Sequence, residues 1–286
     1  MKTSEVMRES GVSIVDVAHS PDSDDLFMFW ALKNRLIETP LAYRFNALHT
    51  QALNEAARMQ AFTVVAVSAA VYPQIAADYL ILPHGASIGR NYGPVLVSKT
   101  QKQVVDLSRS RIGIPGEDTT AARLIRMILP EATFVSYPIV PFEAVFEALD
   151  MDEIDAAVLI HEGQLSYMER GLSAVVNIGQ WWQEKFGLPL PLGINVVRRD
   201  IGLKSISQIS DDISASIHYC LDKQEEIASV IMSDAGTSDI HLGSKEDLLT
   251  YLSMYANEDT RSMSSECLMG LAALLHPFNL GSQHMA

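Results

Sequence analysis

Short apolar segments typical of buried strands alternate along this chain with segments of helical periodicity, and this alternation restricts its fold more than any other feature. The opening strand, 12–18, leads to a helix at 26–36, and the pattern then repeats. Such alternation favours largely parallel sheets with helices packed on them, and so predicts an α/β protein. The predicted strands are 12–18, 41–48, 63–67, 94–98, 111–115, 133–136, 154–160 and 194–197, and the predicted helices are 26–36, 50–60, 121–129 and 141–149.

A glycine-punctuated region between residues 80 and 98 interrupts the alternation, and a second loop, 187–193, precedes the last strand. We expect the strands at 94–98 and 193–197 to form a two-stranded crossing between two α/β lobes. The pattern is helical throughout after residue 205, so the first lobe also takes the C-terminal helices. The predicted lobes are 1–98 plus 195–286, which is discontinuous, and 99–194.

The formal net charge is −14, with 35 Asp and Glu against 21 Lys and Arg. Proteins that grip nucleic acid through its phosphates need clustered basic residues, and no long basic run exists here. We therefore expect neither nucleic acid nor an anionic membrane as a partner. The overall field also disfavours an anionic ligand, so such a ligand needs local donors that outweigh it.

Targeting signals and metal motifs are absent from the sequence. The N-terminus has no apolar core of a secretory signal, and no apolar run approaches the roughly 20 residues of a membrane span. Cys220 and Cys267 fit no metal spacing and suggest no disulfide framework. No GxSxG, Walker, HExxH or CxxC motif occurs. We expect a soluble cytoplasmic protein that uses no metal or cofactor, and proton transfer is the chemistry that remains.

Polar residues follow the predicted strands where those strands end. Ligands of open α/β sheets gather at the carboxyl ends of the strands, so such residues are candidate contacts. Each predicted lobe supplies two of these ends, and facing lobes would bring all of them to one cleft. The ends are Ser20 to Asp25, Ser68, Thr119 with Thr120, and His161 with Glu162.

Ser68, Thr119 and Thr120 stand where helices begin. The first N–H groups of a helix lack intrahelical partners and carry partial positive charge, which favours an anionic oxygen. Each residue taken alone is more often a plain helix cap. The occurrence of the same arrangement in both lobes favours binding of a small carboxylate.

His161 is the candidate catalytic residue. An imidazole titrates near neutrality, so it can take a proton from carbon or oxygen. The alternative is a histidine satisfied by backbone hydrogen bonds. Adjacent strand residues point to opposite faces, so Glu162 is expected only to cap or orient.

Three further groups are weighed against simpler roles. Arg90 and Asn91 lie in the glycine-rich bend and are candidates for neutralising a carboxylate, although a solvated surface is an equal alternative for Arg90. The acidic cluster of Asp22, Asp24 and Asp25 lacks the offsets of a calcium loop, and helix capping together with charge near a helix N-terminus explains it. Trp181 and Trp182 could cover an aromatic ligand, with packing as the alternative.

The chain resembles the menaquinone-biosynthesis family of the futalosine pathway, and within it the 1,4-dihydroxy-6-naphthoate synthases. The resemblance runs from about residue 12 to 260, and the IHEG and WWxxxxGLPLPLG segments are its most specific part. One departure is SPDSDD where typical members have SPCPND, which places Asp24 where an amide is often found. The matching segments are HSPDSDDLFMFWAL (19–32), VSAAVYPQ (67–74), LPHGASIGRNYGPVLVSK (82–99), IPGEDTTA (114–121), IDAAVLIHEGQLSY (154–167), GQWWQEKFGLPLPLG (179–193) and MYAN (254–257).

The resemblance implies a periplasmic-binding-protein type II fold used as an enzyme. It implies cyclic dehypoxanthine futalosine as the carboxylated substrate, with 1,4-dihydroxy-6-naphthoate and dihydroxyacetone as products. The family's proton-accepting histidine falls on His161. Substrate contacts are expected at Ser20, Asp24, Ala66, Val67, Ser68, Arg90, Asn91, Thr119, Thr120, Ala121 and Glu162.

Three alternatives remain. Chorismate dehydratase, of the same superfamily, also binds a carboxylate in a cleft. A non-catalytic solute-binding protein has the same fold but is normally exported. A binding protein for a pyrimidine precursor of thiamin rests on the fold alone.

Overall fold

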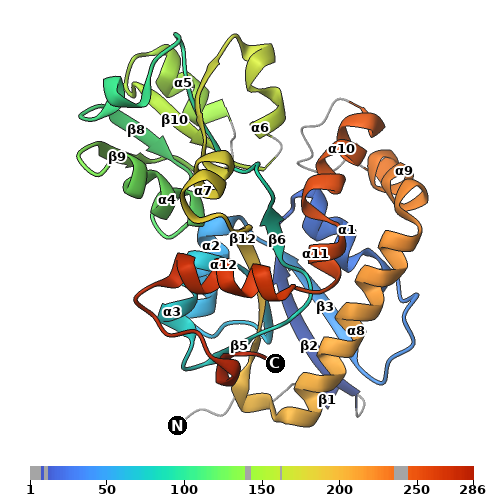
Figure 1. Cartoon of the computed structure of the whole chain (residues 1–286). Helices are drawn as coiled ribbons and strands as arrows, with labels where there is room; N and C mark the ends of the chain where they lie inside the picture. Colours follow the sequence, from blue (N-terminus) through green and yellow to red (C-terminus); the bar gives the residue numbers. More distant parts are fainter. Residues whose placement is uncertain (1–7, 10–11, 139–142, 162, 235–243) are drawn as a thin grey trace.

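A computed structural model describes residues 8–9, 12–138, 143–161, 163–234 and 244–286. Two separate β-sheets, each with its own helices, form two lobes (Figure 1). We call the part built on the seven-stranded sheet the first lobe and the part built on the five-stranded sheet the second lobe. The predicted α/β class is therefore confirmed.

The seven-stranded sheet mixes parallel and antiparallel neighbours. Its centre is parallel: β2 (Val12–His19) lies between β3 (Ala42–Ala47) and β4 (Val64–Ser68). β2 and β4 are rich in Val and Ile, and Val17 and Val64 are fully buried, as expected where both faces of a parallel sheet are covered, whereas β3 is only partly buried. The antiparallel members are β1 (Arg8–Glu9), which pairs with β2, and β12 (Leu190–Arg198), which pairs with β4, β5 (Tyr79–Ile81) and β6 (Ser87–Gly89).

Helices cover both faces of this sheet. On one face α1 (Ser23–Lys33) packs along α8 (Leu203–Asp222), and Met28, Phe29 and Ile213 are buried there against the strands. The other face is covered by α2 (Thr50–Arg58), η1 (Ala69–Val71), α3 (Tyr72–Ile75) and α12 (Ser265–Leu275). The remaining helical segments are α9 (Gln224–Asp234), α10 (Lys245–Tyr255), α11 (Glu258–Arg261), η4 (Arg199–Ile201) and η6 (Ser282–His284).

The second lobe has strand order β11-β7-β10-β8-β9. Its strands β10, β8 and β9 are parallel, whereas β7 runs antiparallel to β10 and β11. The strand bounds are β7 (Val95–Ser98), β8 (Arg111–Ile114), β9 (Thr133–Ser136), β10 (Ala156–Leu159) and β11 (Ser173–Asn177). The helical segments are η2 (Val104–Leu107), α4 (Thr120–Ile128), α5 (Glu143–Asp150), α6 (Gly163–Ser166), η3 (Tyr167–Arg170) and α7 (Ile178–Phe186).

The chain crosses between the lobes at residues 90–94 and again at 187–189. The strand at 95–98 belongs to the second sheet and does not pair with β12, so the predicted two-stranded crossing is wrong, and the predicted boundary at residue 98 falls after this strand instead of before it. The physical reason is that β7 and β12 each enter a sheet directly from the other lobe. They therefore run against their neighbours, and both sheets are mixed where largely parallel sheets were predicted.

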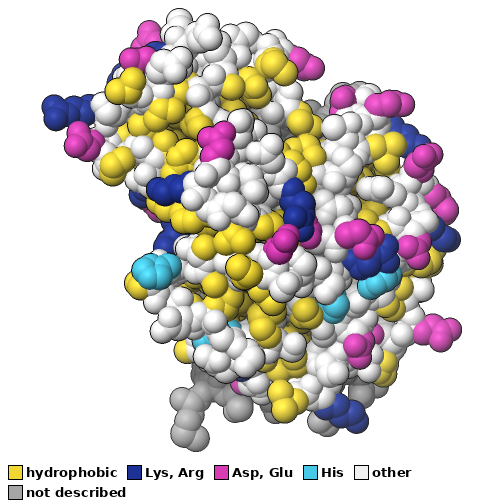
Figure 2. Space-filling model, viewed as in Figure 1, with side chains coloured by type: hydrophobic (Ala, Val, Ile, Leu, Met, Phe, Trp, Pro, Cys, Tyr) yellow, Lys and Arg dark blue, Asp and Glu magenta, His cyan; other side chains and the backbone are white. Residues whose placement is uncertain are grey.

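No helix within the described ranges has both the length and the apolar character needed to cross a bilayer. On the face shown in Figure 2, Lys and Arg are scattered among Asp and Glu and do not gather into one basic patch.

Candidate active site

A cavity of about 100 Å³ lies between the two lobes. Strand ends supply much of its wall, because the carboxyl ends of parallel strands meet at one edge of each sheet. The structure brings nine of the predicted site residues together here. They are Ser20, Asp24, Ala66, Val67, Ser68, Thr119, Thr120, Ala121 and His161.

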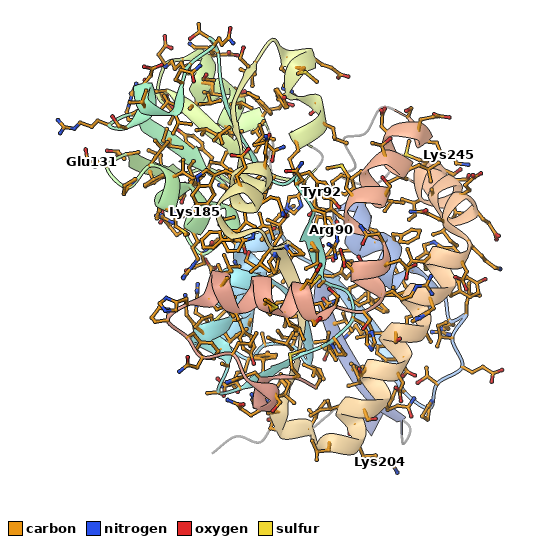
Figure 3. All side chains as sticks on the ribbon, viewed as in Figure 1. Arg90, Tyr92, Glu131, Lys185, Lys204 and Lys245 are labelled. Carbon is orange, nitrogen blue, oxygen red and sulfur yellow. The ribbon has the colours of Figure 1, made fainter. Side chains whose placement is uncertain are left out.

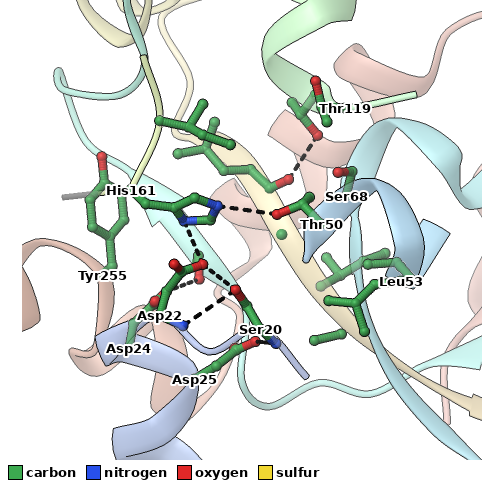
Figure 4. A pocket seen from close by; sticks show the side chains of 18 of the residues that line it. Ser20, Asp22, Asp24, Asp25, Thr50, Leu53, Ser68, Thr119, His161 and Tyr255 are labelled. Atoms are coloured by element: carbon green, nitrogen blue, oxygen red, sulfur yellow. Dashed lines mark hydrogen bonds and ion pairs between the residues drawn. The ribbon is translucent and has the colours of Figure 1, made fainter. Parts of the chain in front are cut away.

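His161 enters the cavity from the second lobe, two residues after β10 ends. Its backbone φ is +53°, in the left-handed region that costs a non-glycine residue of order 1 kcal/mol. The ring meets two side chains of the first lobe (Figure 4): Nδ1 lies 2.8 Å from Asp22 Oδ2, and Nε2 lies 3.1 Å from Thr50 Oγ1. The imidazole therefore spans the gap between the lobes.

Three carboxyl groups from the turn after β2 and the first turn of α1 form what we call the acidic end: Asp22, Asp24 and Asp25. The Asp24 carboxylate accepts from Ser87 Oγ at 2.8 Å, and Asp25 accepts from the Ser20 amide at 2.6 Å. Burial and then the charge of Asp22 raise the pKa of Asp24, and burial and then the charge of Asp24 raise the pKa of Asp25 well above its usual value.

Asp22 behaves in the opposite way. Burial acts to raise its pKa, but the charge of His161 and hydrogen bonds from His161 and Ser20 outweigh burial, so the pKa lies below its usual value. Although Asp22 is the N-cap residue of α1, its side chain makes no capping hydrogen bond. The interpretation of Asp22 as a helix-capping residue is therefore wrong, because its carboxylate pairs with His161 and not with the amides at the start of α1.

The opposite side of the cavity is what we call the hydroxyl end, formed by Ser68, Thr119 and Thr120. Figure 4 shows Ser68 and Thr119 there. Ser68 ends β4, and its Oγ accepts a hydrogen bond from Asn54 Nδ2 at 3.1 Å. An accepted bond leaves the hydroxyl proton for a ligand.

The two threonine hydroxyls already have protein partners. Thr119 Oγ1 caps α4 by accepting from the Ala122 amide at 3.1 Å. Thr120 Oγ1 donates to the Leu192 carbonyl at 2.7 Å, across the lobes. The first N–H groups of α4, at Thr120 and Ala121, have no acceptor within the helix, so this end still presents donors.

Contacts beside the hydroxyl end also join the lobes. Arg58 of α2 forms a 2.7 Å ion pair with Asp118 of the second lobe. Gln51 Nε2 donates to the same carboxylate at 2.9 Å. The hydrogen bond from Arg58 holds the pKa of Asp118 below its usual value despite partial burial. The described structure is therefore one in which the two lobes touch on both sides of the cavity.

Four residues that were predicted to contact or cover a ligand do not line the cavity. Arg90 sits at the first chain crossing (Figure 3) and is bound bidentately by Asp259 at 2.6 and 2.8 Å; neither it nor Asn91 lines the cavity. Trp182 is fully buried and donates to the Pro189 carbonyl. Trp181 packs against Phe186, so both tryptophans serve packing.

Glu162 lies outside the described residues. Several polar lining groups were not predicted. They are Thr50, Ser87, Gln164, Asn195, Tyr251 and Tyr255. Asn195 Oδ1 is a buried acceptor for which the described structure holds no hydrogen-bond partner, so it can take a donor from a ligand. Thr50 carried a usable signal, since it opens the helix that follows β3, whereas the two tyrosines come from a distant helix.

The fold belongs to the periplasmic-binding-protein class. It is similar to a protein of Candida albicans described as having the generic periplasmic binding protein fold (TM-score 0.68, 12% identity, 92% of this chain and 89% of that one). A crystal structure of protein AF1704 from Archaeoglobus fulgidus is more similar, with a TM-score of 0.83 and 33% identity over 91% of this chain and 95% of that one. The predicted fold class is confirmed.

The sequence identifies the group within this class. Residues 15–278 match the family described as menaquinone biosynthesis, and the chain belongs to that family. A 1,4-dihydroxy-6-naphthoate synthase of Streptomyces coelicolor is 27% identical over 91% of each chain. Another, from Thermus thermophilus, is 31% identical over 76% of this chain and 78% of the relative. The prediction of an enzyme of menaquinone biosynthesis is confirmed.

Proposed function

We propose that this enzyme is a lyase that converts cyclic dehypoxanthine futalosine into 1,4-dihydroxy-6-naphthoate, with His161 as the general base. The observation that carries the proposal is the imidazole of His161 in the cavity between the lobes, held at both ring nitrogens. The names of the two curated relatives support the same product.

Besides the base, the reaction requires only that the protein position the substrate and shield it from water. The base removes an acidic proton from the substrate, a carbon–carbon bond breaks and releases the three-carbon fragment as dihydroxyacetone, and the new aromatic ring supplies driving force. Proton transfer by a positioned histidine contributes roughly 10²- to 10⁴-fold to rate. Holding the substrate between two lobes fixes its geometry and excludes water. No step in this scheme requires a cofactor.

The charge distribution of the cavity orients the substrate. Three carboxyl groups at the acidic end repel an anion, while Ser68 and the start of α4 offer donors at the hydroxyl end. The substrate carboxylate therefore binds at the hydroxyl end, and the sugar-derived ring with its hydroxyls lies toward Asp24 and Asn195. We also propose that this enzyme works in the cytoplasm, because it is biosynthetic and its proposed substrate is a small molecule.

The decisive experiment incubates the enzyme separately with cyclic dehypoxanthine futalosine and with chorismate, and identifies the products by mass. We expect 1,4-dihydroxy-6-naphthoate from the first and no change in the second. Dehydration of chorismate would instead make the chain a chorismate dehydratase, and binding without turnover of either would make it a solute-binding protein.

The His161→Ala variant tests the base. We expect turnover to be lost while product affinity, measured by calorimetry, stays within about tenfold, since the base acts on the transition state more than on binding. His218→Ala is the matched control, because His218 lies on α8 and bonds to the Ser214 carbonyl, away from the cavity. Turnover by His161→Ala at the rate of the unaltered enzyme would eliminate the assignment.

A further inference from the structure

The two contacts of the His161 ring indicate which of its nitrogens carries the proton. Asp22, with its pKa below the usual value, is a carboxylate and can only accept a hydrogen bond. The proton on the ring therefore sits at Nδ1, 2.8 Å from Asp22 Oδ2. Nε2 then carries the lone pair, which accepts from the Thr50 hydroxyl at 3.1 Å. Nε2 is thus the nitrogen that can take a proton from a substrate in the cavity.

Asp22 is itself held in place. The Ser20 hydroxyl donates to the same carboxylate oxygen, Oδ2, that meets the histidine. The Asp22 side chain is 12% exposed and that of His161 is 20% exposed, so the pair is shielded from water and its geometry is well defined. A shielded carboxylate opposite Nδ1 stabilises the imidazolium that forms when Nε2 takes a proton.

We propose that Asp22 is a positioning residue that fixes His161 in the Nδ1–H tautomer, makes Nε2 the proton acceptor, and completes the base only when the lobes meet. Asp22 and Thr50 belong to the first lobe and His161 to the second, so opening the cleft separates the ring from both partners. This inference rests on the proposed function and adds to it a base that is switched on by closure.

Other charged groups face the pair and must stay unchanged in any test. Asp24 and Asp25 approach from the first turn of α1, and His49, the residue before α2, acts on Asp22. The purely structural alternative is that Asp22 merely clasps the lobes together. A clasp would change substrate affinity, whereas a positioning residue changes tautomer, kcat and pH profile.

The test is Asp22→Asn, which keeps size and shape but can turn an N–H toward Nδ1. We expect kcat to fall roughly 10²- to 10⁴-fold with KM within about fivefold. Loss of the carboxylate destabilises the imidazolium, so the acidic limb of the pH–rate profile should move to lower pH. Asp16→Asn is the control, because Asp16 lies on β2, the strand that precedes Asp22, but pairs with Arg44 at the surface. We expect it to match the unaltered enzyme.

A second measurement needs no variant of Asp22. Nitrogen-15 NMR of ring-labelled enzyme, with and without 1,4-dihydroxy-6-naphthoate, reports which ring nitrogen carries the proton. His161→Gln identifies the signal among the 8 histidines. We expect Nδ1–H in the product complex and the other tautomer in Asp22→Asn. An Nε2–H tautomer in the unaltered enzyme would overturn the proposal even if Asp22→Asn did not fold.

The outcomes separate this inference from the proposed function. Absence of product from the unaltered enzyme counts against the function alone. Unaltered kcat and pH profile in Asp22→Asn, beside an inactive His161→Ala, would remove Asp22 from the mechanism and leave the function standing. A large rise in KM with kcat unchanged would reduce Asp22 to a clasp and overturn the positioning role.

Discussion

The two ends of the cavity differ in charge, in hydrogen bonding and in how they join the lobes. At the acidic end three carboxyl groups crowd into one turn, and the lobes meet through the shielded Asp22–His161 pair. At the hydroxyl end the donors are neutral, and the lobes meet through the more exposed Arg58–Asp118 pair, whose side chains are 31% and 23% exposed. Figure 4 shows both ends on either side of the imidazole.

The two ends together show how an acidic protein can accommodate the anionic substrate that we propose. The formal net charge of −14 works against a carboxylate everywhere except where local donors outweigh it. Helix N-termini do this without adding any cation. The acidic end suits the base that we propose, because a carboxylate beside an imidazole increases the affinity of the imidazole for a proton.

Removing a donor from the hydroxyl end should have the largest effect on binding. For Ser68→Ala we expect about 2 kcal/mol weaker binding of 1,4-dihydroxy-6-naphthoate, roughly thirtyfold in Kd, since hydrogen bonds to charged groups contribute about 1.5–3 kcal/mol. Calorimetry measures the Kd. The same change at the acidic end, Ser87→Ala, should alter the Kd far less. An equal loss of affinity in the two variants would mean that the carboxylate does not bind at the hydroxyl end as proposed.

Removing a charge from the acidic end should raise stability. Folding raises the pKa of Asp25, so its contribution to stability is complete below the unfolded pKa and is lost as pH rises through the folded pKa. We therefore expect Asp25→Asn to be more stable than the unaltered enzyme at pH 7 by about 1 kcal/mol, or about 2 °C in Tm, and to gain nothing below pH of about 4. Thermal unfolding at both pH values measures this. A loss of stability of equal size at both would show that the Asp25 hydrogen bond outweighs its charge.

Weakening the lobe contact at the hydroxyl end should have the smallest effect. The Arg58–Asp118 pair is partly exposed, and such pairs contribute about 0.2–1 kcal/mol. For Arg58→Ala we expect KM to rise about twofold with kcat unchanged. High salt should remove the difference by screening. A kcat loss as large as that of Asp22→Asn would mean that closure depends on both ends equally.

The sequence predicted the polar ends of the strands, because hydrophobic segments and the residues after them are local features. Ser68, Thr119 and His161 all lie at or after the ends of strands found close to their predicted positions. The four helices predicted with bounds, 26–36, 50–60, 121–129 and 141–149, lie within a few residues of α1, α2, α4 and α5 for the same reason, whereas α7 was missed. The strands of three residues, β5 and β6, were missed, since so short a segment has no periodicity.

The partners of these residues could not be predicted. That Asp22 meets His161, and not the start of its own helix, depends on two lobes coming together across a sequence separation of 139 residues, the difference between 161 and 22. Tyr251 and Tyr255 reach the cavity because α10 folds back onto the first lobe. The loop predicted at 187–193 is partly strand, since β12 begins at Leu190 and accommodates Pro191 beside a register shift against β6.

The double crossing of the chain constrains how the cleft can move. A body tethered at two points swings about the line through them, and twisting about other axes strains one tether or the other. The first tether is tightly fitted, since a methyl group at Gly179 would come 1.9 Å from the Tyr92 carbonyl oxygen, and Arg90 anchors it to Asp259. Any opening and closing of the cleft therefore separates and rejoins the imidazole of His161 and the carboxylate of Asp22 along a single arc.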